Sequence, residues 1–73
     1  MDYGKAFKNV RESAGYSRAE IAEQLGITPN ALWKIENKRT TPKQNTIVKF
    51  CRFMGVPLAF LFISALETQD YKL

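Results

Sequence analysis

The sequence predicts an all-α protein, a compact domain of five short helices connected by tight turns. Apolar residues recur with helical spacing along the whole chain, and no stretch shows the strict alternation of a strand. Gly15, Gly26 and Gly55 stand at the expected helix ends, where glycine readily adopts a left-handed backbone. Seventy-three residues suffice for one small core, so residues 1–73 are expected to form a single domain.

The first two helices are expected over residues 3–14 and 18–25. Ser17 and Glu20 have the spacing of a capping box, in which each side chain accepts a hydrogen bond from the other residue's backbone N–H. This pattern predicts that the second helix begins directly after Ser17. Its buried stripe is expected to consist of Ile21, Ala22 and Leu25.

The third helix is expected over residues 29–36, after a tight corner at Gly26. Thr28 can cap it, and Pro29 occupies its first position, where a missing N–H leaves no hydrogen bond unmade. Two helices that cross this closely need a small residue at the crossing, which Ala22 provides. A glycine corner with a small residue four positions earlier is typical of a helix-turn-helix. The protruding second helix of that motif fits the DNA major groove.

The last two helices are expected over residues 42–54 and 57–66, followed by a polar tail, 67–73, that is expected to fray. Thr41 and Gln44 have the spacing of a second capping box, which predicts a helix start at Pro42.

The fifth helix is apolar on nearly all sides, which in so small a domain favours contact with another chain. We expect Phe60 and Ile63 to lie near the two-fold axis of a symmetric homodimer. The alternative is that the C-terminal tail folds back over them. The core-facing stripe is expected to be Leu58, Leu61, Phe62 and Ala65.

The chain carries a formal net charge of +4, and its cations gather on and just after the third helix. Residues 28–45 hold four lysines and arginines against one glutamate, which gives this stretch a charge of +3. Such a cluster favours a polyanionic partner, although a merely solvated face would have the same composition.

The residue types present favour neither an enzyme nor a metal protein. The chain has no histidine, no cluster of carboxylates and no glycine-rich phosphate loop. We therefore predict no catalytic residues, no metal and no cofactor. Cys51 lies on an apolar stripe and is expected to be a small core residue. We also expect no signal peptide and no membrane span, and thus a cytoplasmic protein.

Several motifs resemble those of the phage-repressor and Cro type of helix-turn-helix regulators, the XRE family. The resemblance covers most of the chain and implies a lambda-repressor-like fold with the helix-turn-helix at helices two and three. Its residues are Arg11, Gly15, S-R-A-E-I-A-E-Q-L-G at 17–26, I-E-N at 35–37, Pro42 and G-V-P-L at 55–58.

This resemblance implies a transcriptional regulator, a repressor or autoregulator, that binds double-stranded DNA as a dimer at a palindromic operator. The start of the third helix would lie in the major groove. The positions that approach bases would be Thr28, Pro29, Asn30, Trp33 and Lys34. The positions that contact the DNA backbone would be Ser17, Arg18, Lys38, Arg39 and Lys43.

Three positions depart from the family pattern. Pro29 replaces a common glutamine and offers no side-chain hydrogen bond to a base. Arg18 also replaces a glutamine, which should strengthen the grip on phosphate. Lys38 replaces a glycine, so Asn37 is expected to adopt the left-handed backbone that ends the third helix.

In the family, the residues that match Arg11 and Glu36 pair between the first and third helices, so we expect a structural ion pair here rather than a DNA contact. Trp33 has a second interpretation, as a partly buried ring packed on the fourth helix.

The alternative function is a protein-interaction module, or an antitoxin-like protein with a toxin or other regulator as its partner, that retains the fold.

Overall fold

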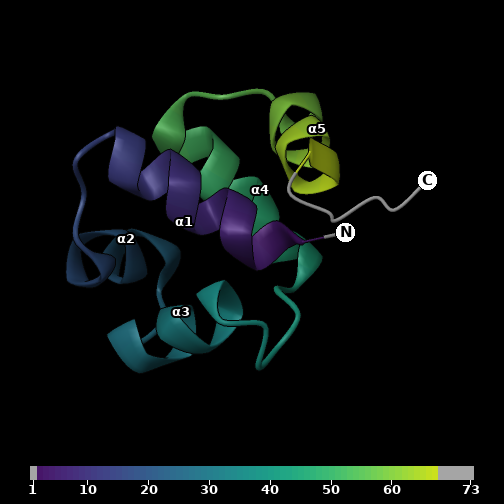
Figure 1. Ribbon diagram of the computed structural model, residues 1–73. Helices are drawn as coiled ribbons and strands as arrows, with labels where there is room; N and C mark the ends of the chain where they lie inside the picture. The colour runs from purple at the N-terminus through teal and green to yellow at the C-terminus, as the bar shows by residue number, and fades with distance from the viewer. Residues whose placement is uncertain (1, 68–73) are drawn as a thin grey trace.

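The computed structural model of the protein describes residues 2–67, which fold into five helices around one core (Figure 1). Within this part of the chain no strand occurs, so the predicted all-α fold is confirmed. The expected frayed tail lies outside the described residues, except for Glu67, which ends the last helix. The helices are α1 (Tyr3–Ser13), α2 (Arg18–Leu25), α3 (Pro29–Glu36), α4 (Gln44–Met54) and α5 (Leu58–Glu67).

Helix α1 is the central helix of the domain. It lies between the α2–α3 pair on one side and α5 on the other, with α4 behind it in the view of Figure 1. Its fully buried Phe7 stacks on Phe50 of α4, with the ring centroids 4.1 Å apart and the planes within 7°. Cys51 is buried, as expected, and its burial raises the pKa of the thiol. The largest other fully buried side chains are Ile21, Leu32 and Leu61.

The predicted start of the fourth helix is wrong. Helix α4 begins at Gln44, and its N-cap residue, Lys43, makes no side-chain capping hydrogen bond. The second capping box at Thr41 therefore does not form. Pro42 is buried and Lys43 is extended (ψ 152°), so the chain is still loop where a helix was expected.

The predicted core face of the fifth helix is also wrong in part. Leu61 and Ala65 are fully buried, but Leu58 is 53% exposed and Phe62 is 42% exposed. The helix contacts the core through a narrow ridge of residues four apart, so the wide stripe expected from its composition remains on the surface. Phe60 and Ile63 are exposed as well.

Among the described residues no single helix has the length and apolar character needed to cross a membrane. Helices α4 and α5 would reach that length only as a pair, and they are bent by 109° relative to each other.

Candidate nucleic-acid interface

The corner between α2 and α3 has the geometry that the sequence predicts. Ser17 Oγ accepts a hydrogen bond from the Glu20 N–H (3.1 Å), and Glu20 Oε1 accepts one from the Ser17 N–H (2.9 Å), so the first capping box is confirmed. The hydrogen bond from the Ser17 backbone and, to a smaller extent, that from its side chain lower the pKa of the Glu20 carboxyl. Gly26 ends α2 with a left-handed backbone (φ 70°, ψ 30°), and Ala22 is fully buried at the crossing.

Helix α3 turns one face to the core and leaves the other free. Thr28 Oγ1 accepts a hydrogen bond from the Ala31 N–H (3.0 Å), and Pro29 occupies the first turn. Leu32 and Ile35 are buried. The exposed face includes Pro29, Asn30, Trp33 and Lys34.

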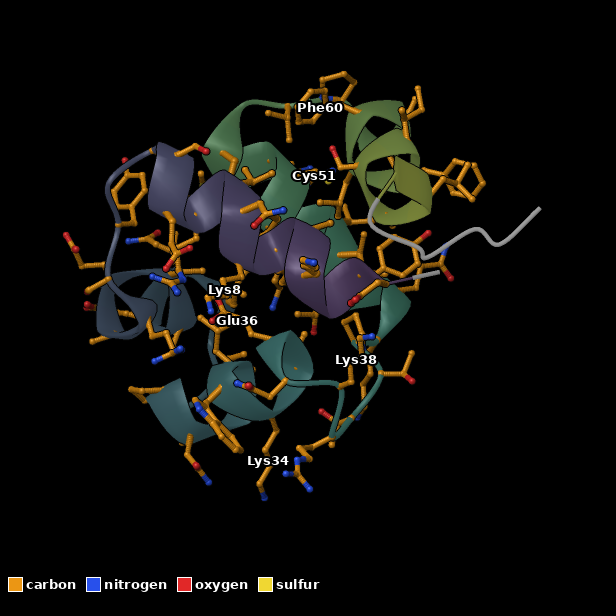
Figure 2. All side chains as sticks on the ribbon, in the orientation of Figure 1. Lys8, Lys34, Glu36, Lys38, Cys51 and Phe60 are labelled. Carbon is orange, nitrogen blue, oxygen red and sulfur yellow. The ribbon has the colours of Figure 1, made fainter. Side chains whose placement is uncertain are left out.

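A groove of about 430 Å³ runs between the exposed face of α3 and the loop that leads to α4. It brings Asn30 and Lys34 of α3 together with Lys43 of the loop. Lys34 points away from the body of the molecule in Figure 2. Sequence reasoning missed the hydroxyl groups in this groove, although their clustering in the T-T-P-K-Q-N-T stretch was visible. They belong to Thr40, Thr41 and Thr46.

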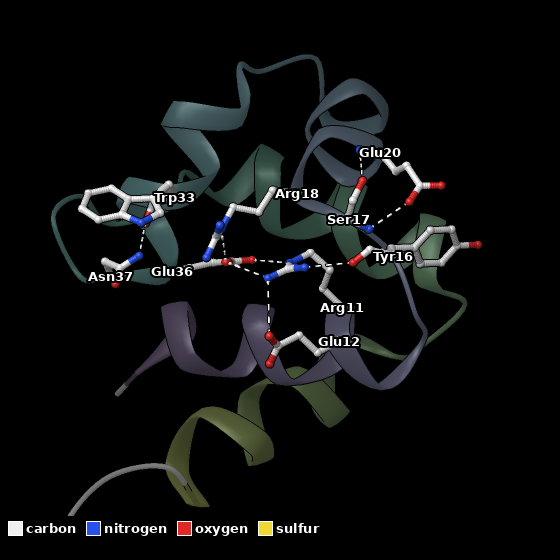
Figure 3. A network of polar contacts seen from close by, with 9 residues as sticks. All are labelled: Arg11, Glu12, Tyr16, Ser17, Arg18, Glu20, Trp33, Glu36 and Asn37. Carbon is white, nitrogen blue, oxygen red and sulfur yellow. Dashed lines mark hydrogen bonds and ion pairs between the residues drawn. The ribbon is translucent and has the colours of Figure 1, made fainter.

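Trp33 is 39% exposed and is not among the side chains that pack against the core. These observations give no support to the interpretation that its ring packs on the fourth helix. Its carbonyl oxygen accepts a hydrogen bond from Asn37 Nδ2 at 2.9 Å (Figure 3).

The left-handed residue after α3 is Lys38 (φ 61°), not Asn37 (φ −104°) as expected. The Lys38 N–H donates to the Ile35 carbonyl (3.2 Å), and the Arg39 N–H donates to the Lys34 carbonyl (2.8 Å). These two bonds form a Schellman motif, which requires the left-handed backbone one residue beyond the cap. Asn37 is that cap, and its side chain donates back into the helix instead.

Lys38 is tied to the start of the chain. Its Nζ lies 3.1 Å from Oδ2 of Asp2, whose Oδ1 accepts a hydrogen bond from the Lys5 N–H (2.9 Å) as the N-cap of α1. Burial alone would raise the pKa of the Asp2 carboxyl, but the Lys5 hydrogen bond and the Lys38 ammonium together lower it. Sequence reasoning missed Asp2, although an aspartate just before a helix is a capping signal.

Glu36 is the centre of a buried polar network (Figure 3). Its Oε2 accepts a hydrogen bond from Arg11 Nε (2.7 Å), and its Oε1 accepts bonds from Arg11 Nη2 (3.1 Å) and Arg18 Nε (2.9 Å). Arg11 Nη1 donates to the Tyr16 carbonyl (2.9 Å), and Nη2 lies 4.0 Å from Glu12 Oε2. The structure thus brings the expected pair together and adds Arg18, which the sequence placed at the DNA backbone only.

The other residues expected at the DNA backbone are all on the surface. Arg39 and Lys43 are exposed on the loop between α3 and α4, and Ser17 is exposed at the start of α2. Within residues 2–67 no group of three or more histidine, cysteine, aspartate or glutamate side chains gathers that could hold a metal ion.

A capped helix pair with a glycine corner and an exposed second helix defines a helix-turn-helix domain. A comparison with protein families agrees: the helix-turn-helix model matches residues 7–61. The chain belongs to this family, and the resemblance to XRE-type regulators is confirmed.

Two relatives come from Bacillus subtilis. The SPbeta prophage-derived HTH-type transcriptional regulator YonR is 36% identical over 59 residues, which cover 81% of this chain and 55% of YonR. The HTH-type transcriptional regulator ImmR is 34% identical over 61 residues, which cover 84% of this chain and 48% of ImmR. This chain therefore spans about half the length of these relatives. Both are named as transcriptional regulators and not as enzymes, in agreement with the residue types of this chain.

Among solved structures, the clp gene regulator ClgR of Corynebacterium glutamicum superposes with a TM-score of 0.90 over 97% of this chain and 92% of that one. The sequences are 22% identical, so this likeness concerns the fold.

Proposed function

We propose that this protein is a sequence-specific DNA-binding transcriptional regulator, a repressor or autoregulator, that binds a palindromic operator as a homodimer. The observation that carries the proposal is the exposed face of α3. Asn30 and Lys34 project from it beside a groove that Lys43 also lines. A helix presented in this way fits the major groove of double-stranded DNA, with its first turns among the bases.

Base recognition falls to the side chains at the start of α3. Asn30 can form two hydrogen bonds with an adenine edge, and Lys34 can donate to O6 or N7 of guanine. Thr28 and Pro29 can make apolar contacts to a thymine methyl group, and the Thr28 hydroxyl, which accepts the capping hydrogen bond from Ala31, can still donate to a base or phosphate. Trp33 borders the same face and can contact a thymine methyl or the sugar–phosphate edge.

Backbone contacts position the protein without reading the sequence. Arg39 and Lys43 supply exposed cations on the loop, and the first N–H groups of α2 and α4 can bind phosphate. Lys38 is a weaker candidate than the sequence implied, because Asp2 already neutralises part of its charge. Ser17 and Arg18 complete the proposed set.

The homodimer proposal is supported by the exposed apolar side chains of α5. Phe60 is 47% exposed and Ile63 is 52% exposed, and such a cluster is costly to leave in water. In Figure 2, Phe60 and Lys34 lie at opposite ends of the molecule, so a contact through α5 leaves the face of α3 free for DNA. Two copies would present their α3 helices to half-sites about 34 Å apart.

The decisive experiment is selection of bound sites from a random DNA pool, followed by mobility shifts on the selected duplex. We expect a palindrome whose half-sites lie about one helical turn apart. Asn30→Ala and Lys34→Ala should each cost about 1–3 kcal/mol of binding free energy and relax the preference at one base position. Lys49→Ala removes an exposed lysine of α4 as the matched control and should leave that preference unchanged.

Sedimentation at rising concentration, with and without the selected duplex, tests the dimer. Ile63→Lys should shift the equilibrium toward monomer without unfolding the domain, because Ile63 is exposed. A wild-type chain that stays monomeric on DNA and selects single half-sites would refute the dimer.

The second candidate is a protein-interaction module whose partner, a toxin or another regulator, covers the apolar surface of α5. Absence of any mobility shift, even at low salt, would favour it over DNA binding. A cytoplasmic location is part of the DNA-binding proposal.

A further inference from the structure

Glu36 binds two arginines, which differ in burial and in how many of their guanidinium nitrogens hydrogen-bond within the protein. Arg11 is 8% exposed, and all three of its guanidinium nitrogens donate to oxygen atoms of the protein. Arg18 is 36% exposed and donates to Glu36 through Nε only. Among residues 2–67, Nη1 and Nη2 of Arg18 have no hydrogen-bond partner. The guanidinium group of Arg11 is therefore buried and fully hydrogen-bonded. That of Arg18 is bound to Glu36 through Nε, while its Nη1 and Nη2 remain available for another partner.

The charges of this network do not cancel. Glu36 is fully buried and carries one negative charge against two guanidinium groups. Glu12 makes a further ion pair with the network, but its side chain is 56% exposed and its Oε2 lies 4.0 Å from Arg11 Nη2. Because Arg18 is the more exposed of the two arginines, the excess positive charge of the network reaches the surface at its guanidinium group. The open Nη1–Nη2 edge offers two parallel N–H donors, a geometry that matches two oxygens of a phosphate.

The position of the network on α3 indicates which part of DNA this edge would meet. Glu36 is the last residue of α3, and Thr28 caps the other end. Eight helical residues span about 12 Å, which is close to the width of the major groove. If the start of α3 lies among the bases, a group tied to its end lies at the rim of the groove, where the phosphates are.

We infer that Glu36 is a positioning residue for DNA binding, which holds Arg18 so that its Nη1–Nη2 edge clamps one backbone phosphate. The inference rests on the proposed DNA-binding function and assigns a second role to a residue that otherwise belongs to the core. Glu36 fixes the plane of the guanidinium before DNA arrives, and the clamp is independent of base sequence.

The test is the affinity for a short mixed-sequence duplex as a function of salt, measured where circular dichroism shows each variant folded. Arg18→Gln should reduce the slope of log K against log salt by about one, the value for one lost phosphate contact. Arg18→Lys keeps the charge and the slope but lacks the two-pronged edge, so its affinity should fall about tenfold. Arg52→Lys, an exposed arginine of α4 outside the proposed contacts, should bind as the wild type does.

Glu36→Gln provides an opposite-sign test. Removing a negative charge near DNA should tighten binding by simple Coulomb attraction, whereas loss of positioning should weaken it. Tighter binding by Glu36→Gln, or wild-type affinity of Arg18→Lys, would overturn the inference. If Glu36→Gln does not fold, Arg18→Lys decides alone. A wild-type chain that binds no duplex at low salt would overturn the proposed function itself, which is a different result from failure of the clamp.

Discussion

Gly4 of α1 packs directly against the carbonyl group of Ile35 in α3, so closely that a Cβ atom on Gly4 would overlap it. Both residues are buried, and the neighbouring atoms belong to the backbone rather than to a side chain that could turn aside. This contact sets how near the first helix lies to the proposed DNA-reading helix.

Gly4→Ala is therefore expected to lower the free energy of unfolding, although alanine is the better helix former. Overpacking of this kind typically costs about 1–3 kcal/mol, which exceeds the gain of about 1 kcal/mol in helix propensity. Urea unfolding measures the difference. Asn9→Ala, at an exposed position of the same helix, should be neutral or stabilising. A Gly4→Ala protein as stable as the wild type would mean that α1 and α3 can separate without loss.

Glu36→Gln is expected to destabilise the domain strongly, because it leaves the buried guanidinium of Arg11 without its charged partner. Breaking a buried pair on one side costs about 3–5 kcal/mol, which for a domain of this size lowers the Tm by more than about 10 °C. Thermal unfolding followed by circular dichroism measures it. Glu12→Gln, which removes a mostly exposed carboxylate, should change the free energy of unfolding by less than about 0.5 kcal/mol. An unchanged Tm for Glu36→Gln would contradict the buried-pair interpretation.

Position 38 should prefer glycine over alanine. Both substitutions remove the contact with Asp2, but only glycine relieves the left-handed backbone at φ 61°. We expect Lys38→Gly to be more stable than Lys38→Ala by about 1 kcal/mol in urea unfolding. Because the two variants lack the same ion pair, each is the control for the other, and equal stabilities would show that this backbone carries no strain.

The fall in the free energy of unfolding at acid pH should depend in part on Asp2. Its pKa in the folded protein is lowered from the usual 3.8, since Lys5 and Lys38 outweigh the effect of burial. The ionised carboxylate therefore stabilises the fold above that usual value, and this stabilisation is lost as the pH falls through the folded pKa. Asp2→Asn keeps a capping side chain but loses the charge.

We expect Asp2→Asn to be less stable than the wild type at neutral pH, and the gap to shrink as the pH falls below 3.8 toward the lowered folded pKa of Asp2, where the carboxylate takes up its proton. Urea unfolding across this range measures the difference. A gap between the two proteins that does not change with pH would rule out the charge as its cause.

Trp33 should report DNA binding directly, because it is the single tryptophan of the chain and its ring is exposed on α3. Contact with a base or with the sugar–phosphate edge would remove water from the ring and change its fluorescence. A titration should saturate at the same duplex concentration as the mobility shift. Emission that stays constant through a complete shift would remove Trp33 from the proposed interface.

The helix-turn-helix could be predicted from the sequence because local hydrogen bonds define it. Ser17 and Glu20 cap each other three residues apart, and Thr28 accepts from Ala31 at the same spacing. Gly26 has no side chain, so it adopts the left-handed backbone of the turn without support from distant residues. The same local capping pattern failed at Thr41 and Gln44, where Pro42 is buried in the loop and α4 begins only at Gln44.

The sequence by itself thus determined where α2 and α3 begin, where the corner lies and which side chains of α3 face outward. Only the tertiary structure decided which groups share the charge of Glu36 and which residue after α3 adopts the left-handed backbone. Arg11 and Arg18 lie 25 and 18 residues from Glu36 along the chain, so their meeting depends on how three helices cross. Those crossings follow from the packing of the whole core, which no local spacing encodes.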